Sequence, residues 1–214
     1  MLRYAITDRR RLAPDEDMRQ SLLCRLAERW GRAGIEFVQL REKDLTAGEL
    51  ANLVRKVRSA IEISCAEASH RPRLLVNTRA DVAIAAGADG VHLTSAQGSL
   101  TPAQVRRLYA SAGLPDPVVS VSCHSLAEVA AAREAGASLI LFGPVFEKVA
   151  GDPETPDYVD SLVSDGTGLG LLRSACSLAA PIPIFALGGV TQANAELCQS
   201  AGAAGIAGIR LFVG

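Results

Sequence analysis

The sequence alternates eight times between a short run of β-forming residues and a longer segment of helical period. The eight runs span residues 4–7, 37–40, 74–77, 90–93, 118–122, 139–142, 184–187 and 205–209. Strands that alternate with helices form parallel sheets, and eight such units in 214 residues predict an α/β fold, a single (β/α)8 TIM barrel over residues 1–214. An open doubly wound sheet is the alternative, but it usually has fewer strands and a GxGxxG turn after the first one. Here the first run continues into Thr7-Asp8-Arg9-Arg10, without a glycine.

Pairs of glycine and alanine precede several of the runs. They lie at Ala33-Gly34, Gly87-Ala88, Gly136-Ala137 and Gly202-Ala203. Glycine at such a place ends a helix in a left-handed conformation and turns the chain towards the next strand. Four similar helix exits indicate four similar units, so we interpret the repeat as architectural and not as a binding motif.

The charges are balanced, which restricts the classes of partner. The chain has 22 basic and 23 acidic residues and a formal net charge of -1. This gives no sustained field to attract nucleic acid or an anionic membrane, so an anionic ligand must be met by local groups. No stretch approaches the roughly 20 apolar residues of a membrane span, and the N-terminus opens on a strand instead of a signal peptide. We therefore expect a cytoplasmic protein.

The cysteines are odd in number, widely spaced and free of any CxxC pair. They are Cys24, Cys65, Cys123, Cys176 and Cys198. This pattern argues against a disulfide framework or a zinc site. Cys24, Cys176 and Cys198 fall among apolar helical neighbours, where cysteine behaves as a small hydrophobe. Cys123 adjoins a candidate catalytic segment.

A glycine pair at the end of the seventh run is a candidate phosphate site. Functional groups of a barrel lie at the carboxyl ends of its strands, and phosphate often binds after strands seven and eight. Gly188 and Gly189 allow close approach of a ligand to the backbone, and Thr191 is a plausible N-cap of the next helix. Ile209 and Arg210 follow the eighth strand, where Arg210 adds a charge. The competing interpretation is a tight turn with a solvated Arg210.

Two cations after the second run are candidates for a second anionic group. Arg41 and Lys43 are two residues apart, so in a continuing strand they would share a face over the end of the barrel. The competing interpretation is a surface ion-pair cluster of these two residues with Glu42 and Asp44.

The histidines differ in their surroundings. His124 follows the fifth run, and an imidazole there suits a proton shuttle because its pKa lies near neutrality. Its neighbour Ser125 is the expected helix cap, with Glu128 completing a capping box. His92 lies within a strand and is interpreted as a hydrogen-bonded core histidine, whereas His70 is interpreted as loop surface.

Residues 143–168 form the one long connection. The segment mixes prolines and glycines with acidic residues and follows the sixth strand, on the catalytic face of a barrel. Loops of this length are usually functional lids or disordered insertions, and both interpretations stay open.

The same residues carry a resemblance to a known family. The matching segments are QLREKD at 39–44, VNTRADVAIAAGADGVHL at 76–93, SCHSLAEV at 122–129, FGPVFE at 142–147 and ALGGVTQAN at 186–194. Together they resemble the thiamine phosphate synthase and thiazole tautomerase superfamily, nearly end to end and at the expected strand ends. The resemblance implies a function in thiamine biosynthesis.

The synthases of that family join a pyrimidine pyrophosphate to a thiazole phosphate, with carboxylates that hold magnesium. They typically carry an Asn-Asp pair after strand three and a Gly-Gln-x-Asp segment after strand four. The matching positions here read Asn77-Thr78 and Thr94-Ser95-Ala96-Gln97, so both aspartates are absent. The Thr-rich segment that receives pyrophosphate is replaced by Glu147-Lys148-Val149-Ala150. A hydroxyl and an amide are poor substitutes for the carboxylates that magnesium favours.

The tautomerases perform a metal-free proton shift that aromatises a thiazole carboxylate phosphate, and this chain resembles them in Ser-x-His-Ser and FGxVFE. The resemblance implies that His124 moves the proton and that Arg41 or Lys43 meets the carboxylate. Asn77 and Ser122 are expected to bind substrate. The phosphate is expected at Gly188, Gly189, Ile209 and Arg210.

Thiazole tautomerisation without metal or other cofactor is therefore our leading hypothesis. A diverged synthase, which would need Mg²⁺, and a non-catalytic homologue that binds the phosphorylated ligand are the alternatives. The expected partner is a small phosphorylated thiazole-like molecule, and a homo-oligomer is possible.

Overall fold

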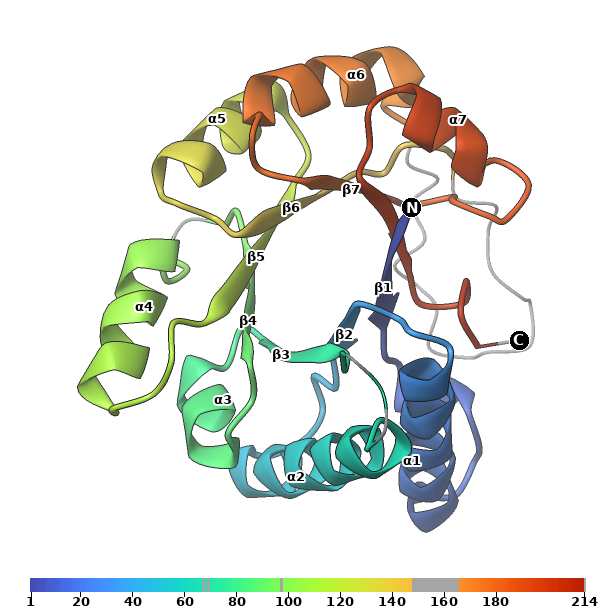
Figure 1. The fold of residues 1–214 in the computed structure, drawn as a ribbon, viewed down its shortest axis with the longest axis vertical. Coiled ribbons are helices and arrows are strands. Elements are labelled where there is room, and N and C mark those ends of the chain that lie inside the picture. Colours follow the sequence, from blue (N-terminus) through green and yellow to red (C-terminus); the bar gives the residue numbers. More distant parts are fainter. Residues whose placement is uncertain (67, 69, 97, 148–165, 214) are drawn as a thin grey trace.

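A computed structural model describes residues 1–66, 68, 70–96, 98–147 and 166–213. Its strands form a closed parallel barrel in which each strand pairs with the next and β1 pairs with β8 (Figure 1). The strands are β1 (Leu2–Ile6), β2 (Phe37–Leu40), β3 (Arg73–Asn77), β4 (Gly90–Thr94), β5 (Val118–Cys123), β6 (Leu139–Phe142), β7 (Ile184–Leu187) and β8 (Gly205–Gly208). The predicted (β/α)8 barrel is confirmed.

Seven α-helices within the described residues surround the barrel. They are α1 (Glu16–Arg32), α2 (Ala47–Ser64), α3 (Ala80–Ala86), α4 (Pro102–Ser111), α5 (Leu126–Glu134), α6 (Gly168–Ala179) and α7 (Ala195–Ser200), with a short 3-10 helix η1 (Arg9–Arg11) before α1. After β8 the chain makes a turn beside α1, where Trp30 Nε1 donates to the Phe212 carbonyl at 2.8 Å. No helix among the described residues is long and apolar enough to cross a membrane.

Local sequence signals explain where several helices begin and end. Thr46 and Thr101 begin α2 and α4 as complete capping boxes, each with the glutamate or glutamine three residues later. All four glycines of the glycine–alanine repeat take a positive φ, between 69° and 100°. The architectural interpretation of that repeat is confirmed.

The interior of the barrel has an apolar side and a polar side. Tyr4, Ile6, Leu139, Leu141, Phe185 and Ala207 form one buried cluster, contributed by β1, β6, β7 and β8. The strands β2 to β5 instead contribute Gln39, Asn77, His92, Ser120 and Ser122, which bond to one another or to Tyr4. Burying a polar group costs free energy unless it forms hydrogen bonds. We therefore look for a functional site on the polar side of the barrel.

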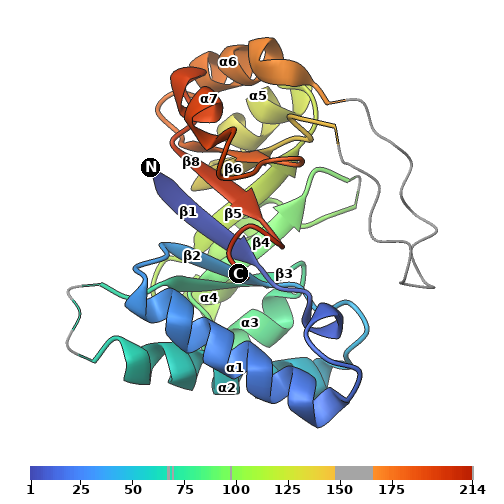
Figure 2. The ribbon, with the colours of Figure 1, turned by 90° about the vertical axis from the view of Figure 1, so that its right-hand side faces the viewer.

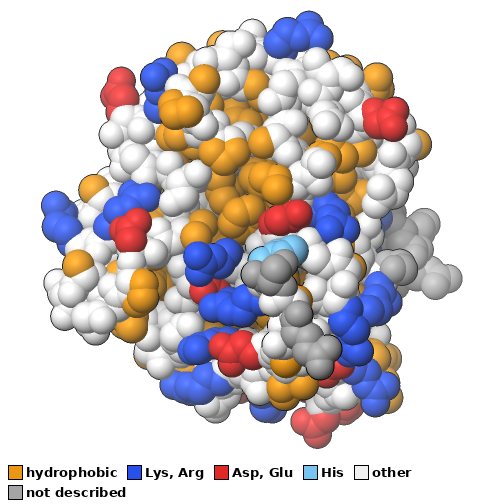
Figure 3. Space-filling view, in the orientation of Figure 1, with side chains coloured by type: hydrophobic (Ala, Val, Ile, Leu, Met, Phe, Trp, Pro, Cys, Tyr) orange, Lys and Arg blue, Asp and Glu red, His pale blue; other side chains and the backbone are white. Residues whose placement is uncertain are grey.

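The two ends of the barrel are distinct. The strands run from left to right in Figure 2, so their carboxyl ends, which we call the mouth, face right. Figure 3 shows the opposite end, where apolar side chains lie in the middle of the face with charges of both signs around them. Residues 148–165 of the long connection 143–168 lie outside the described residues. The two interpretations of this connection, a lid and a disordered insertion, concern those residues and both stay predictions.

Candidate functional site

A buried ion pair joins the first two loops of the mouth. Arg9, in η1 after β1, places Nη1 3.1 Å from Glu42 Oε2, with 3% and 2% of the two side chains exposed. The Arg9 backbone N–H and the Thr7 hydroxyl also donate to the Glu42 carboxylate. Burial raises the pKa of Glu42, and these donors oppose that rise. The pair is therefore buried and held by several hydrogen bonds.

Arg9 also binds Asp44 through both terminal nitrogens, at 2.8 and 2.9 Å. Glu42 and Asp44 are thus occupied by Arg9, and the expected alternative, an ion-pair cluster of these carboxylates with Arg41 and Lys43, is wrong. The physical reason is that the cation comes from the loop after β1, where the Arg9 guanidinium can be buried and bind both carboxylates at once.

Arg41 and Lys43 are left without an ion pair in the part of the chain that the structure describes. Strand β2 ends at Leu40, so they lie in the following loop and not in a continuing strand as expected. The Arg41 backbone N–H donates to Thr7 Oγ1 at 2.9 Å, which fixes the loop. Arg41 also helps to lower the pKa of His92, so its charge acts on the polar side of the barrel.

Gln39 belongs to the site and was missed among the predicted residues. Its Nε2 donates to Asn77 Oδ1 at 2.9 Å, which brings one predicted substrate residue into a bonded pair. Its Oε1 is buried and has no partner among the described residues. A buried acceptor left open is costly, so this oxygen suits a donor on a ligand. The signal in the sequence was a glutamine two residues from Phe37 on the barrel-facing side of a strand.

His92 is buried in the polar side of the barrel, as interpreted. Its two ring nitrogens lie 2.8 Å from Ser120 Oγ and 2.9 Å from Ser122 Oγ. Burial, aided by the charge of Arg41, lowers the pKa of His92 to about 3, so the ring is neutral at physiological pH. Ser122, a predicted substrate residue, is therefore held by a core histidine.

His124 is exposed at the mouth, directly after β5. Its Nδ1 bonds to the carbonyl of Gly143, and because a carbonyl only accepts, Nδ1 carries the hydrogen. In the neutral ring, Nε2 is then the unprotonated nitrogen. This tautomer leaves Nε2 able to take a proton from a ligand.

The residues after His124 begin α5 in a different way from the expected one. Ser125 is the N-cap, as predicted, and accepts from the Glu128 backbone N–H at 3.2 Å. Glu128 does not complete the capping box with Ser125, because its carboxylate accepts from the backbone N–H of His124 instead. His124 is thus held by two hydrogen bonds, one from its ring to the Gly143 carbonyl and one from its backbone N–H to Glu128.

The cysteines are all free thiols. Cys123, next to His124, is completely buried, and burial raises the pKa of its thiol to about 12. The thiolate is the nucleophilic form of cysteine, so this residue is structural.

The turn after β7 has the open backbone expected of an anion site. Gly188 and Gly189 take φ of 87° and 64°. Their amides donate to no acceptor among the described residues, whereas their carbonyls accept from Phe146 and Asn194. The expected helix cap at Thr191 is wrong: α7 begins at Ala195, because Thr191 and Asn194 exchange hydrogen bonds in a separate turn.

Gly189 also serves packing. A Cβ there would meet the Glu147 carbonyl oxygen and the Phe146 Cβ, each at 2.7 Å. We expect Gly189→Ala to lower the free energy of unfolding by about 1–3 kcal/mol, since it overpacks this contact and strains a left-handed residue. Denaturant unfolding measures the loss.

Gly113→Ala is the matched control for that prediction. Gly113 has nearly the same φ, 68°, but a Cβ there would have no neighbour within 4 Å. The control therefore carries the backbone strain alone. Equal losses in the two variants would show that the contact with the 146–147 backbone does not matter.

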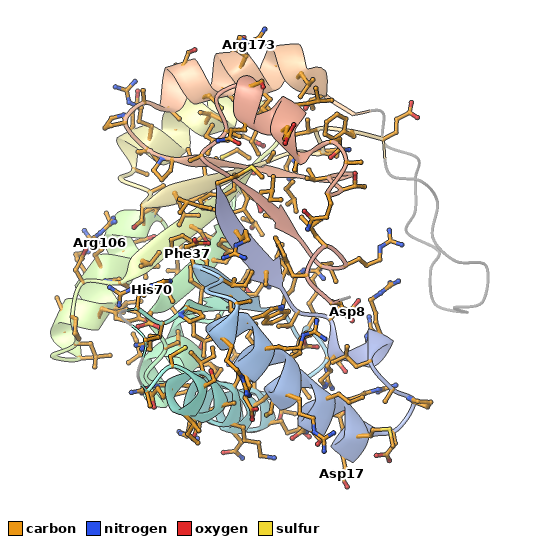
Figure 4. All side chains as sticks on the ribbon, turned by 45° about the vertical axis from the view of Figure 1, so that its right-hand side comes forward. Asp8, Asp17, Phe37, His70, Arg106 and Arg173 are labelled. Carbon is orange, nitrogen blue, oxygen red and sulfur yellow. The ribbon has the colours of Figure 1, made fainter. Side chains whose placement is uncertain are left out.

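Ile209 and Arg210 follow β8, as predicted, and line a cavity of about 120 Å³ with Asp8 and Trp30. Figure 4 shows Asp8 at the mouth and Phe37 and His70 towards the opposite end. Arg210 is exposed and has no ion pair in the described ranges. Its charge is thus available at the mouth, beside the first loop and α1.

The side chains after β3 and β4 do not offer the carboxylate ligands that magnesium favours. Asn77 Oδ1 accepts from Gln39, and Thr94 Oγ1 bonds to Ser99 at 2.9 Å. Thr78 takes φ of 58°, a left-handed conformation that suits Asp or Asn far better than a β-branched residue. No group of three or more His, Cys, Asp or Glu residues that could hold a metal occurs among the described residues. In this turn the side chain of Thr78 offers a hydroxyl and not a carboxylate.

Comparisons with known proteins agree on one family. The family model described as thiamine monophosphate synthase matches residues 3–212. "Putative thiamine-phosphate synthase 2" of Aquifex aeolicus is 36% identical over 210 residues, which cover 98% of this chain and 96% of that protein. "Putative thiamine-phosphate synthase" of Geobacter sulfurreducens is 38% identical over 98% of this chain and 85% of its own length.

A solved structure supports the same assignment. The thiamine phosphate pyrophosphorylase from Pyrococcus furiosus has a TM-score of 0.71 at 26% identity, over 97% of this chain and 85% of that one. A 3-hexulose-6-phosphate synthase, at a TM-score of 0.61 and 18% identity over 97% of this chain and 88% of that one, shares the fold alone. With the family model matching nearly the whole length, this chain belongs to the thiamine monophosphate synthase family.

Proposed function

We propose that this barrel is an enzyme that shifts a proton on a phosphorylated thiazole carboxylate, without a metal. The observation that carries the proposal is the orientation of His124, whose Nδ1 is bonded to the Gly143 carbonyl. Nε2 of the neutral ring is free to accept a proton from one atom of the ligand and to return it to another. Aromatisation of a thiazole tautomer is a proton transfer of this kind.

The remaining residues of the mouth suit the two anionic groups of that ligand. The open amides of Gly188 and Gly189, with Ile209 and Arg210 after the neighbouring strand, would hold the phosphate. Arg41 or Lys43 would meet the carboxylate, since Arg9 occupies the nearby acidic side chains. Asn77 and Ser122 would contact the ring from β3 and β5.

Thiamine phosphate synthesis is the second candidate, and the comparisons favour it. The relatives found by sequence carry the synthase name, and none of those described above is called a tautomerase. Against it stands the sequence at the two positions where the synthases carry aspartates: Thr78 offers a hydroxyl and Gln97 an amide, whereas magnesium favours carboxylates. The names support the transferase reaction, and the side chains at the mouth support the isomerase reaction.

One pair of assays separates the candidates. Purified protein is incubated with the thiazole carboxylate phosphate tautomer in the presence of a chelator, and separately with pyrimidine pyrophosphate, thiazole phosphate and Mg²⁺. We expect faster aromatisation in the first assay and no pyrophosphate release in the second. Metal-dependent pyrophosphate release without aromatisation would overturn the proposal in favour of the synthase. Tight binding of thiazole phosphate with turnover in neither assay would make the chain a binding protein.

A further inference from the structure

Four polar side chains form one unbranched chain of hydrogen bonds inside the barrel. Tyr4 OH lies 3.0 Å from Ser120 Oγ, which lies 2.8 Å from His92 Nδ1, and His92 Nε2 lies 2.9 Å from Ser122 Oγ. Tyr4 and Ser120 are completely buried, whereas Ser122 is half-buried near the end of β5. Within the described ranges these side chains bond to nothing else. The chain therefore leads from the interior of the barrel to the mouth.

The direction of these bonds follows from counting hydrogens. Each hydroxyl has one hydrogen to donate, and the neutral ring of His92 has one N–H. If Tyr4 donates to Ser120, then Ser120 donates to His92 Nδ1, and the ring carries its hydrogen on Nε2 and donates to Ser122. In this arrangement every buried hydrogen has an acceptor.

The other arrangements leave a buried hydrogen without an acceptor. If Ser120 donates to the Tyr4 oxygen, the Tyr4 hydrogen has no acceptor. If Tyr4 and His92 both donate to Ser120, the hydrogen of Ser120 has none. A buried donor without a partner is costly, and such donors are rare in proteins. One direction alone satisfies all of the groups.

We propose that Ser120 is a positioning residue that acts through His92 to hold the Ser122 hydroxyl as a hydrogen-bond donor towards the mouth. Because Ser122 accepts from His92, its own hydrogen is free for a ligand. Asn77 is constrained in the same way, since its Oδ1 accepts from Gln39 and its amide N–H groups remain to be donated. Ser122, Asn77 and Arg41 thus each offer a donor to the mouth, so a ligand group beside these three side chains is an acceptor such as an anionic oxygen.

The proposal is tested first in the protein without ligand, by ¹⁵N NMR of its three histidines. We expect wild-type His92 to carry its hydrogen on Nε2, with Nδ1 showing the chemical shift of an unprotonated ring nitrogen. Tyr4→Phe removes the other oxygen that Ser120 could donate to and leaves His92 Nδ1 as the acceptor of its hydrogen, so the Nε2–H tautomer is expected to persist. Tyr109→Phe is the control for loss of a buried hydroxyl, because it deletes one that donates to the Ala88 carbonyl at 3.3 Å, outside the chain of bonds. It should also leave His92 unchanged.

Ser120→Ala is the variant that decides the test. It leaves His92 Nδ1 without a partner in either tautomer and does not touch the ligand, so a mixture of both tautomers is expected. We expect this variant to bind thiazole phosphate about 2- to 10-fold more weakly than wild type in calorimetry, the range of one hydrogen bond. The proposal is overturned by an Nδ1–H tautomer in wild type, or by an unchanged tautomer or unchanged affinity in Ser120→Ala.

The binding measurement rests on the proposed function, whereas the NMR measurement does not. A wild-type protein that shows the expected tautomer but no affinity for thiazole phosphate would refute the ligand and keep the direction of the bonds. A protein that turns over the thiazole but has the opposite tautomer would refute the direction of the bonds alone.

Discussion

Replacing Arg9 by methionine is expected to lower the free energy of unfolding by about 3–5 kcal/mol, because it leaves a buried carboxylate without its cation. The side chain of Glu42 is only 2% exposed and keeps the Thr7 hydroxyl and a backbone N–H as its donors. Methionine follows much of the volume of the arginine stem, so the loss reports on the charge more than on a cavity. Chemical denaturation of the variant and the wild type measures it.

Arg32→Met is the matched control. Arg32 pairs with Glu28 at 2.7 Å, a shorter distance than in the Arg9 pair, but its side chain is 62% exposed. We expect a loss below about 1 kcal/mol, since solvent screens such a pair. Arg9→Met combined with Glu42→Gln should recover part of the loss, because the neutral amide is cheaper to bury. Equal losses for Arg9→Met and Arg32→Met would contradict the argument.

The loss in Arg9→Met should depend on pH. Burial raises the pKa of Glu42 above its ordinary value of 4.5, and without Arg9 a major opposing influence is gone. A carboxyl with a raised folded-state pKa stabilises the protein below the unfolded pKa, and this stabilisation is lost as the pH rises through the folded value. The deficit relative to wild type should therefore be full at neutral pH and shrink as the pH falls towards 4.5.

The barrel could be predicted because its signals are local. Each of the eight strands was placed within a few residues of its observed bounds, since apolar runs and the glycines at 34, 87, 136 and 202 are visible in short windows. The rule that functional groups lie at the carboxyl ends of strands then placed His124, Arg41 and the glycine pair at the mouth.

The pairings within the site could not be predicted, because they join distant parts of the chain. Arg9 and Glu42 are 33 residues apart, and Arg9 lies in a run of three arginines, a residue type that is mostly exposed in proteins. Gln39 and Asn77 are separated by 38 residues. Whether a cation is free or occupied depends on such contacts, which is why the sequence could not choose between a binding role and a salt-bridge role for Arg41.

Replacing His124 by alanine is expected to slow aromatisation of the thiazole tautomer by about 10²- to 10⁴-fold, the usual contribution of one acid–base group. The affinity for thiazole phosphate should change little, since the phosphate is expected at the turn after β7. Steady-state kinetics with a parallel binding measurement tests both statements. The expected pattern is therefore a fall in kcat with a nearly constant Kd.

Two further variants separate proton transfer from packing. His124→Gln offers an amide N–H to the Gly143 carbonyl but has no basic nitrogen, so it should be as slow as alanine. His70→Ala removes an exposed histidine at the opposite end of the barrel, and it should retain full activity (Figure 4). If His124→Gln kept the wild-type rate, the ring would only hold the loop at Gly143. The base would then have to be another residue of the mouth, since His92 is too deeply buried to take a proton.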